Sequence, residues 1–390
     1  MDFVNPFTPA FGSMPQHFFG RTTELRFVEE ALDNPNSPHR AFFVTGSRGS
    51  GKTTLLEKTS QLARRRRWLT IDVHSTHASK AIISQLAGGM EKTTEKSIDP
   101  SVMGVTVGHA TSRITERYDE SSLAQLLVTK TRSLSSYEGI CITVDEIQKV
   151  PEHDAENICA SVQLAMRKGL PVVIALAGLP GAKEKVASYP GCTFMQRAHD
   201  MRIGSLIVEE TLAAFRNMLK LVPQIDASDE AVWEMGAFSE GYPYLMQLVG
   251  YYIVGRYGDV RNSVTQVEPA DVEAIEPLAM ASYRANVLDP VLGKLSGGMS
   301  SYLSAMCSVE DDAARASCSE VAGQMGKTTS EVSSYRQRLI TQRLIEPAGR
   351  GYVRFLLPHV RDYYLEAPVD EPADDNQYWN RIPKKRRVSG

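Results

Sequence analysis

A glycine-rich segment carries the most specific chemistry in this sequence. Residues 46–53 read GSRGSGKT and fit the pattern G-x-x-x-x-G-K-[ST]. An apolar run at residues 41–44 precedes the segment and a helix-forming run follows it, which is the context that the pattern requires. The glycines let the backbone curl so that its N–H groups converge, and the N-terminus of the next helix adds partial positive charge. The segment therefore predicts a phosphate-binding P-loop.

The residue types at the end of this loop predict how a nucleoside triphosphate is held. Lys52 supplies a point charge to the β- and γ-phosphates, and the Thr53 hydroxyl is the expected magnesium ligand. We therefore expect ATP or ADP and Mg²⁺ as the bound cofactors. The nucleotide-binding candidates in this segment are Gly46, Ser47, Arg48, Gly49, Ser50, Gly51, Lys52, Thr53 and Thr54.

A second chemical signal is a pair of acids at the end of an apolar run. Residues 139–144 are apolar on both faces, which predicts a strand buried within a parallel sheet. Asp145 and Glu146 follow directly and fit the Walker B pattern. We expect Asp145 to hold magnesium, directly or through water, and Glu146 to polarise the attacking water. Lys52 and Glu146 are therefore the first two predicted catalytic residues.

The elements that must position these groups follow from the pattern along the chain. Residues 88–118 are poor in apolar side chains and predict an insertion with a short hairpin at 102–107. Thr22 or Thr23 is the expected cap of the first helix. The other expected core elements are helices at 22–32, 121–134 and 154–168 and strands at 68–73 and 171–180.

Composition limits the class of protein. The chain has 390 residues and a net charge of −3, which suits two or three domains without a global basic field. No apolar run is long enough for a membrane span, and residues 1–15 lack the features of a signal peptide. The cysteines show no metal-binding spacing and predict reduced packing residues of a cytoplasmic protein, with nucleoid association as an option. They are Cys141, Cys159, Cys192, Cys307 and Cys318.

Two basic runs, at 64–67 and 383–388, do not by themselves predict a specific binding site. The arginines at 64–67 fit a solvated helix end, where cations suit the helix dipole, and a nucleic-acid patch is the alternative. The tail at 367–390 is acidic and then basic, and we expect it to be disordered. Its basic run at 383–388 either makes nonspecific electrostatic contacts or resembles a nuclear-localisation signal.

The second half of the chain predicts two further units. Residues 208–254 have a wholly helical pattern, and a polar linker at 258–270 leads into another helical stretch. From residue 300 the order helix, turn, helix, hairpin predicts a winged helix. We expect its third helix and wing to expose side chains suited to phosphate and base-edge contacts, and an intramolecular or protein-binding winged helix is the alternative. The DNA-binding candidates are Ser333, Arg336, Gln337 and Arg350, with Arg343 as an additional one.

The order of the motifs carries a resemblance to a known group of proteins. The order is Phe19-Gly20-Arg21, the P-loop, Val144-Asp145-Glu146-Ile147-Gln148, Ala177-Gly178-Leu179-Pro180, Gln196-Arg197, Gly241-Tyr242-Pro243-Tyr244 and the winged helix. It resembles the bacterial and archaeal ATPases at the border of the AAA+ and STAND classes, relatives of the origin-recognition ATPases. The resemblance implies an α/β fold, with a P-loop NTPase parallel-sheet core of the AAA+ type followed by a helical lid and a winged-helix domain.

The resemblance also implies roles for individual residues. Phe19 and Arg21 fall in the segment that touches the adenine, and Pro243 matches a proline that packs on it. Arg197 falls where this class often has an arginine that acts on a nucleotide, such as the γ-phosphate of a neighbouring subunit, and Arg202 is the second candidate for this role. A surface or helix-capping arginine is the equal alternative for Arg197. His359 falls where STAND proteins place a histidine over ADP, although a structural histidine is favoured here.

Two departures from the pattern are visible in the sequence. Ala177 and Gly178 stand where AAA+ proteins often have a polar residue that senses the γ-phosphate. The lid segment also lacks an arginine of the usual sensor kind. The missing lid arginine weakens a straight analogy with origin-recognition ATPases.

The sequence predicts five segments and an ATP-dependent function. The predicted segments are 1–39, an N-terminal extended segment and adenine-side helix; 40–206, the P-loop ATPase core; 207–295, the helical lid and linker; 296–366, the winged helix; and 367–390, the tail. The leading hypothesis is an ATP-dependent switch that is coupled to double-stranded DNA, with a homo-oligomer or a protein partner and no membrane. The alternative is a signalling or defence scaffold whose winged helix contacts protein, and a kinase-like phosphotransferase ranks below both.

Overall fold

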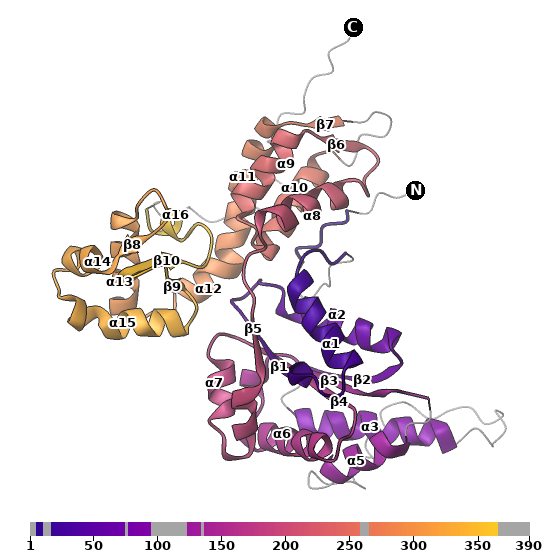
Figure 1. The fold of residues 1–390 in the computed structure, drawn as a ribbon. Coiled ribbons are helices and arrows are strands. Elements are labelled where there is room, and N and C mark those ends of the chain that lie inside the picture. The colour runs from indigo at the N-terminus through magenta and orange to yellow at the C-terminus, as the bar shows by residue number, and fades with distance from the viewer. Residues whose placement is uncertain are drawn as a thin grey trace.

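A five-stranded parallel sheet forms the core of the N-terminal half (Figure 1). The computed structural model describes residues 5–10, 17–74, 77–94, 123–133, 136–257 and 265–365. The strand order is β2-β3-β4-β1-β5, and every pair of neighbours is parallel. The strands are β1 (Ala41–Thr45), β2 (Trp68–Val73), β3 (Gly139–Val144), β4 (Val172–Gly178) and β5 (His199–Arg202). The predicted parallel-sheet core is therefore confirmed.

Helices cover both faces of this sheet, which explains why the central strands are apolar on both sides (Figure 1). Along β1, Phe42 and Val44 pack with α1 and α2, whereas Phe43 packs on the opposite face. The helices of the first face are α1 (Thr22–Asp33) and α2 (Lys52–Arg65). Those of the second face are α3 (Ala78–Thr94), α5 (Leu123–Ser133), α6 (Glu152–Arg167) and α7 (Ala182–Ala187), followed by the 3-10 helix η4 (Pro190–Arg197).

Two details of the predicted core need correction or fall outside the structure. The first helix is capped neither by Thr22 nor by Thr23, because Arg21 is its N-cap residue and no side chain closes the helix end. Helix α3 extends to Thr94, into the expected insertion, and the predicted hairpin at 102–107 lies outside the described residues. The charged tail at 367–390 lies outside them as well.

The lid is mostly, but not wholly, helical. Its helices are α8 (Val208–Leu219), α9 (Asp229–Ser239), α10 (Pro243–Tyr257) and α11 (Pro269–Tyr283). The prediction of an all-helical lid and a polar linker is wrong at two short strands, β6 (Ile225–Ala227) and β7 (Thr265–Val267), which pair in parallel. Val267 is fully buried there, and its carbonyl accepts from the Ser228 N–H. The pairing thus joins the entry of α9 to the entry of α11.

The C-terminal domain has the element order that the predicted winged helix requires. Its sheet has the antiparallel order β8-β10-β9, and α15 begins with a capping box between Thr328 and Glu331. A π-helix (Arg284–Leu288) and α12 (Asp289–Leu292) connect this domain to α11. The elements are α13 (Gly297–Val309), β8 (Ala316–Ser317), α14 (Cys318–Gln324), α15 (Thr329–Thr341), β9 (Ile345–Pro347), β10 (Tyr352–Phe355) and α16 (Val360–Leu365). One buried apolar cluster runs through lid and C-terminal domain without a break.

The N-terminal segment packs on the lid, which the sequence did not predict. Phe7 is only 2% exposed, and a Cβ at Gly250 would lie 2.1 Å from its ring. The Thr8 N–H donates to Gln247 Oε1 at 2.8 Å, and Asn5 Nδ2 donates to the Tyr251 carbonyl at 3.1 Å. Residues 5–10 therefore pack against α10. None of the helices in the described residues is long and apolar enough to cross a membrane.

Candidate nucleotide-binding site

The loop between β1 and α2 has the conformation that a P-loop needs. A Cβ at Gly46 would lie 2.5 Å from the Ile203 carbonyl oxygen, so a larger residue does not fit there. Gly49 has φ 82°, which glycine adopts without strain. The Ser50 hydroxyl donates to the Ser47 carbonyl at 2.9 Å and closes the turn. Because α2 begins at Lys52, its free N–H groups face the loop.

Lys52 lies inside the loop. Its side chain is buried, and Nζ donates to the Ser47 carbonyl at 2.8 Å. Burial lowers the pKa of Lys52, and the carboxylates of Glu146 and Asp145 oppose this shift. A buried cation held by a carbonyl is poised to exchange that weak partner for a phosphate oxygen.

Thr53 and Asp145, the two predicted magnesium ligands, bring two side-chain oxygens together. Thr53 Oγ1 donates to Asp145 Oδ2 at 2.6 Å, and Asp145 Oδ1 accepts from the Glu146 N–H at 2.8 Å. The Asp145 side chain is only 6% exposed, so its carboxylate is held in place at the end of β3. A hydroxyl and a carboxylate at this spacing fit the oxygen-ligand preference of Mg²⁺. The predicted pair of ligands is thus brought together by the fold.

Glu146 is held by neighbours that the sequence did not point to. Its carboxylate accepts from Gln148 Nε2 at 2.9 Å and lies 3.1 Å from Lys149 Nζ. Its backbone is left-handed, with φ 51°, which is uncommon for a residue other than glycine. The second acid is thereby turned away from the line of β3 and into the cleft.

Gln148 also places a polar group at the end of β4, where the sequence has no polar residue. Its Oε1 accepts from the Leu179 N–H at 3.2 Å, directly beyond that strand. A Cβ at Gly178 would lie 2.7 Å from the same oxygen, so only glycine leaves room for this contact. The amide of Gln148 therefore links Glu146 to the end of β4, where the sequence offered only Ala177 and Gly178.

Phe19 and Arg21 lie at the cleft, with different surroundings. Phe19 is among the residues that line it. Arg21 is buried, and its guanidinium donates to the Ser50 carbonyl at 3.2 Å and to the Gly204 carbonyl. Arg21 therefore braces the P-loop against the segment after β5, in addition to lining the cleft.

The lid is hydrogen-bonded directly to the P-loop, a contact that the sequence did not predict. The Tyr242 hydroxyl donates to the Arg48 carbonyl and lies 3.0 Å from Ser47 Oγ. The Tyr244 N–H donates to the Gly49 carbonyl at 3.2 Å. Tyr242 is fully buried, and burial raises the pKa of its hydroxyl, which keeps it protonated as a donor. Pro243, between the two tyrosines, starts α10 and lines the cleft.

These residues surround a cleft of about 760 Å³, a size typical of ligand sites. The P-loop, Asp145 and Glu146 form its polar end, and Phe18, Met218 and Met246 contribute apolar walls. The far side is closed by the connection to the C-terminal domain and by the domain itself. The residues there are Asn286, Val287, Lys294, Gln342 and Leu344. Core, lid and C-terminal domain therefore share one cleft.

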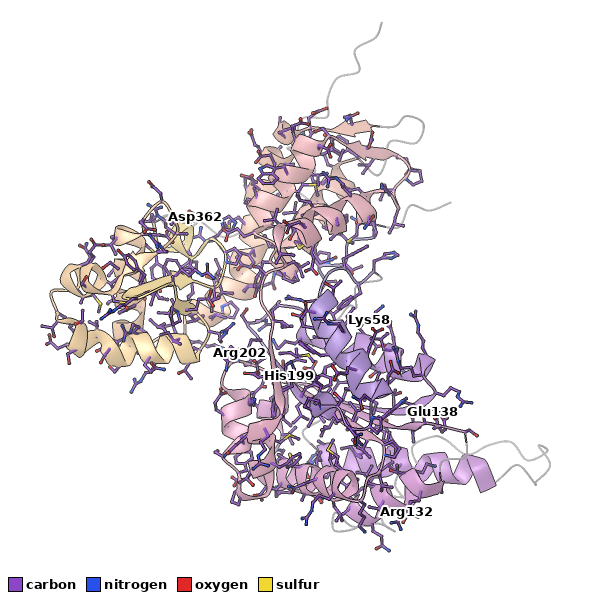
Figure 2. The ribbon with its side chains drawn as sticks, in the orientation of Figure 1. Lys58, Arg132, Glu138, His199, Arg202 and Asp362 are labelled. Carbon is purple, nitrogen blue, oxygen red and sulfur yellow. The ribbon has the colours of Figure 1, made fainter. Side chains whose placement is uncertain are left out.

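Three other predicted residues lie away from this cleft. Arg197 is exposed at the end of η4 and does not line the cleft. Arg202, which is labelled in Figure 2, lies at the end of β5. Its Nε lies 2.6 Å from Asp200 Oδ2. His359 contacts the Asp362 carboxylate through Nδ1 and the Phe238 carbonyl through Nε2, both at 2.8 Å. His359 is therefore a structural link between α16 and α9.

The DNA-binding candidates on α15 differ in exposure. Ser333 and Gln337 are exposed. Arg336 is an exception to the predicted exposure, because it is half-buried and its Nη1 donates to Cys318 Sγ at 3.5 Å. Arg338, which was not a candidate, is exposed on the same helix. The helical period separates Arg336 from Arg338, since buried Val332 and Leu339 fix the inward face of α15.

The strand order, the P-loop and the acidic pair define the core as that of an AAA+ P-loop protein. Comparisons with known proteins agree. Residues 17–174 match the family described as "AAA ATPase domain", and residues 285–364 match one described as "Domain of unknown function (DUF8462)". The predicted AAA+ identity of the core is therefore confirmed. A search of curated proteins found no match.

Two solved structures of one protein show the same fold over most of the chain. The Aeropyrum pernix ORC2 protein, in its ADPNP-ADP complexes, is 12% identical, with a TM-score of 0.58 over 93% of this chain and 98% of that one. Its ADP form gives 0.53 at the same identity and the same coverage. The Pyrobaculum aerophilum Cdc6p structure is 14% identical and has a TM-score of 0.48, over 93% of this chain and 97% of that one.

Proposed function

We propose that this chain is an ATP-dependent switch that couples its nucleotide state to double-stranded DNA through the C-terminal domain. One observation carries the proposal. The cleft that begins at the P-loop is closed by Gln342 and Leu344, which follow α15 in the C-terminal domain. A nucleotide in that cleft touches the same unit that carries the candidate DNA-binding helix. The ORC2 structures are described as ADPNP-ADP and ADP forms, which supports these cofactors.

The chemistry of the proposed site follows from residues already placed. Thr53 and Asp145 would hold Mg²⁺, which would neutralise charge on the phosphates. Lys52 binds the β- and γ-phosphates, and Glu146 orients and polarises the attacking water. We propose that Arg197, which is exposed, reaches the γ-phosphate of a neighbouring subunit, so hydrolysis is slow without that neighbour.

A chain of contacts supports coupling between the P-loop and the C-terminal domain. The Tyr242 ring packs against Tyr283 with centroids 5.7 Å apart. Arg284, next along the chain, starts the π-helix and donates to the Tyr363 carbonyl in α16 at 3.2 Å. Because the two domains also share one apolar cluster, we propose that lid and winged helix move as one body.

The proposed DNA surface is the exposed side of α15 together with the wing between β9 and β10. Ser333, Gln337 and Arg338 are exposed on the helix, and Arg350 is exposed on the wing. Their donors suit phosphates and base edges. Arg336 remains a candidate only if its guanidinium leaves Cys318.

A protein-binding winged helix is the second candidate function. The contact of His359 with the Phe238 carbonyl favours it, because this contact docks the C-terminal domain on the lid. In this alternative the domain holds the protein closed on ADP and does not bind DNA.

Anisotropy of a labelled DNA duplex at several salt concentrations tests the proposal. We expect binding that weakens steeply as salt rises, and a shallower salt dependence in Arg338→Ala and Arg350→Ala. Arg167→Ala, an exposed arginine on α6 of the core, is the matched control and should leave binding unchanged. Absence of DNA binding in every nucleotide state would exclude the DNA-coupled switch and favour the second candidate.

A further inference from the structure

A second cavity lies on the other side of the P-loop. It has a volume of about 640 Å³ and is bounded by the P-loop residue Ser47, by residues 203–205 after β5 and by the C-terminal domain. Ser47 also lines the nucleotide cleft. The start of the P-loop is therefore the partition between the two spaces.

Arg343 brings a positive charge to this second cavity. It directly follows Gln342 and precedes Leu344, both of which line the nucleotide cleft. Its backbone is left-handed, with φ 57°, a conformation that persists in a residue other than glycine only where the surroundings enforce it. The turn after α15 thus reaches both sides of the P-loop partition.

Three of the four acids around this cavity lie beside other basic groups. Arg354 pairs with Glu346 at 2.5 Å, His359 with Asp362 at 2.8 Å, and Arg361 lies 3.8 Å from Glu310. Glu240 is the fourth acid of the wall. Within the described part of the chain, the Arg343 side chain makes no hydrogen bond or ion pair. The cavity therefore contains a guanidinium without an ion-pair partner among the described residues.

The geometry of Lys52 indicates which ligand group lies nearest to this guanidinium. Lys52 Nζ is 2.8 Å from the Ser47 carbonyl, and a P-loop lysine binds the β- and γ-phosphates. A triphosphate held by Lys52 would therefore bring its terminal phosphate toward Ser47, at the partition. A diphosphate leaves this position without its anion. Guanidinium groups bind phosphates through two parallel hydrogen bonds.

We propose that Arg343 recognises the terminal phosphate of ATP from the C-terminal domain of the same chain. The inference rests on the proposed binding of ATP at the P-loop. It assigns Arg343 to nucleotide recognition and away from DNA. Since Arg343 directly follows the turn that ends α15, its movement toward the phosphate pulls the candidate DNA-binding helix toward the core. ATP and ADP are thereby distinguished by a residue of the domain that they control.

Calorimetric titration of the full chain with ADP and with a slowly hydrolysed ATP analogue, both with Mg²⁺, tests this role. We expect Arg343→Ala and Arg343→Gly to weaken binding of the analogue about tenfold, the usual size of one lost charge-assisted contact. Binding of ADP should change less than twofold. Glycine adopts the left-handed backbone of residue 343 without strain, so backbone strain does not explain a loss of affinity in Arg343→Gly. Arg167→Ala, at an exposed position on α6, is the control and should bind both nucleotides like the wild type.

The outcomes separate this role from the proposed function. Equal weakening of both nucleotides, or no weakening of either, would overturn the role of Arg343. Wild-type affinity for both nucleotides in Lys52→Ala would overturn the ATP site itself. Hydrogen exchange gives a second readout, because residues 342–344 should be protected by the analogue and not by ADP.

Discussion

The Tyr242 hydroxyl of the lid lies 3.0 Å from the Ser47 hydroxyl of the P-loop. Tyr242 donates its single proton to the Arg48 carbonyl, so Ser47 is the donor in the first contact. The Arg48 carbonyl and the Ser47 hydroxyl both belong to the P-loop. A side chain of the lid is thus hydrogen-bonded directly to the P-loop.

Removing this hydroxyl should uncouple lid and loop. We expect Tyr242→Phe to keep the fold, because the ring and its contact with Tyr283 remain, and to lose about 1 kcal/mol of unfolding free energy. A double-mutant cycle with Ser47→Ala, measured by urea denaturation, should give a coupling of about 0.5–1 kcal/mol. Strictly additive effects of the two substitutions would show that the contact carries no energy.

Substitutions at Lys52 and Glu146 should affect ATP binding and ATP hydrolysis separately. Lys52→Ala removes the cation at the phosphates, and we expect it to abolish stabilisation by ATP and Mg²⁺ in a thermal unfolding assay. Glu146→Gln keeps the shape of the site, so it should bind ATP but release no phosphate. Full turnover by Glu146→Gln would contradict the role of Glu146.

Gln148 should act on turnover by positioning Glu146. Gln148→Ala removes the donor to that carboxylate and the acceptor of the Leu179 N–H. We expect kcat to fall about tenfold while the affinity for ATP stays within twofold, since Gln148 is not among the residues that line the cleft. Lys149→Ala is the comparison, because Lys149 is exposed and should have a smaller effect. A change in KM alone would argue against positioning.

His199 should make stability depend on pH. Burial, and then the neighbouring His39, lowers the pKa of His199 below its ordinary value of 6.5. Its neutral form is therefore favoured by folding, and the resulting stability is complete above about pH 6.5 and lost as the pH falls through the folded pKa. We expect the Tm to fall between pH 7 and pH 5. A smaller fall in His199→Phe would assign the effect, and an identical fall would exclude it.

The sequence predicted the parts of the site that depend on local patterns. The P-loop, the strand before Asp145 and the capped helix α15 each follow from spacing within about 15 residues. The contacts that complete the site join distant residues. Tyr242 and Ser47 are separated by 195 positions, and Gln148 and Leu179 by 31. No periodicity connects such pairs.

The short strands and the N-terminal contact were missed for related reasons. Strands β6 and β7 have three residues each, too few for an alternation to be visible. Phe7 is buried because Gly250, far along the chain, leaves space for its ring. Arg336 was expected on the surface by residue type, whereas its position on the helix turns it toward Cys318. In each case tertiary packing decided the outcome.

The most direct test of the account is the affinity for a DNA duplex, measured at one salt concentration without nucleotide, with ADP and with a slowly hydrolysed ATP analogue. The account predicts that the wild-type affinity differs between ADP and the analogue by about tenfold, a typical allosteric coupling, and that Lys52→Ala shows one affinity in all three conditions. Equal affinity of the wild type in all three conditions would contradict the coupling of nucleotide state to DNA.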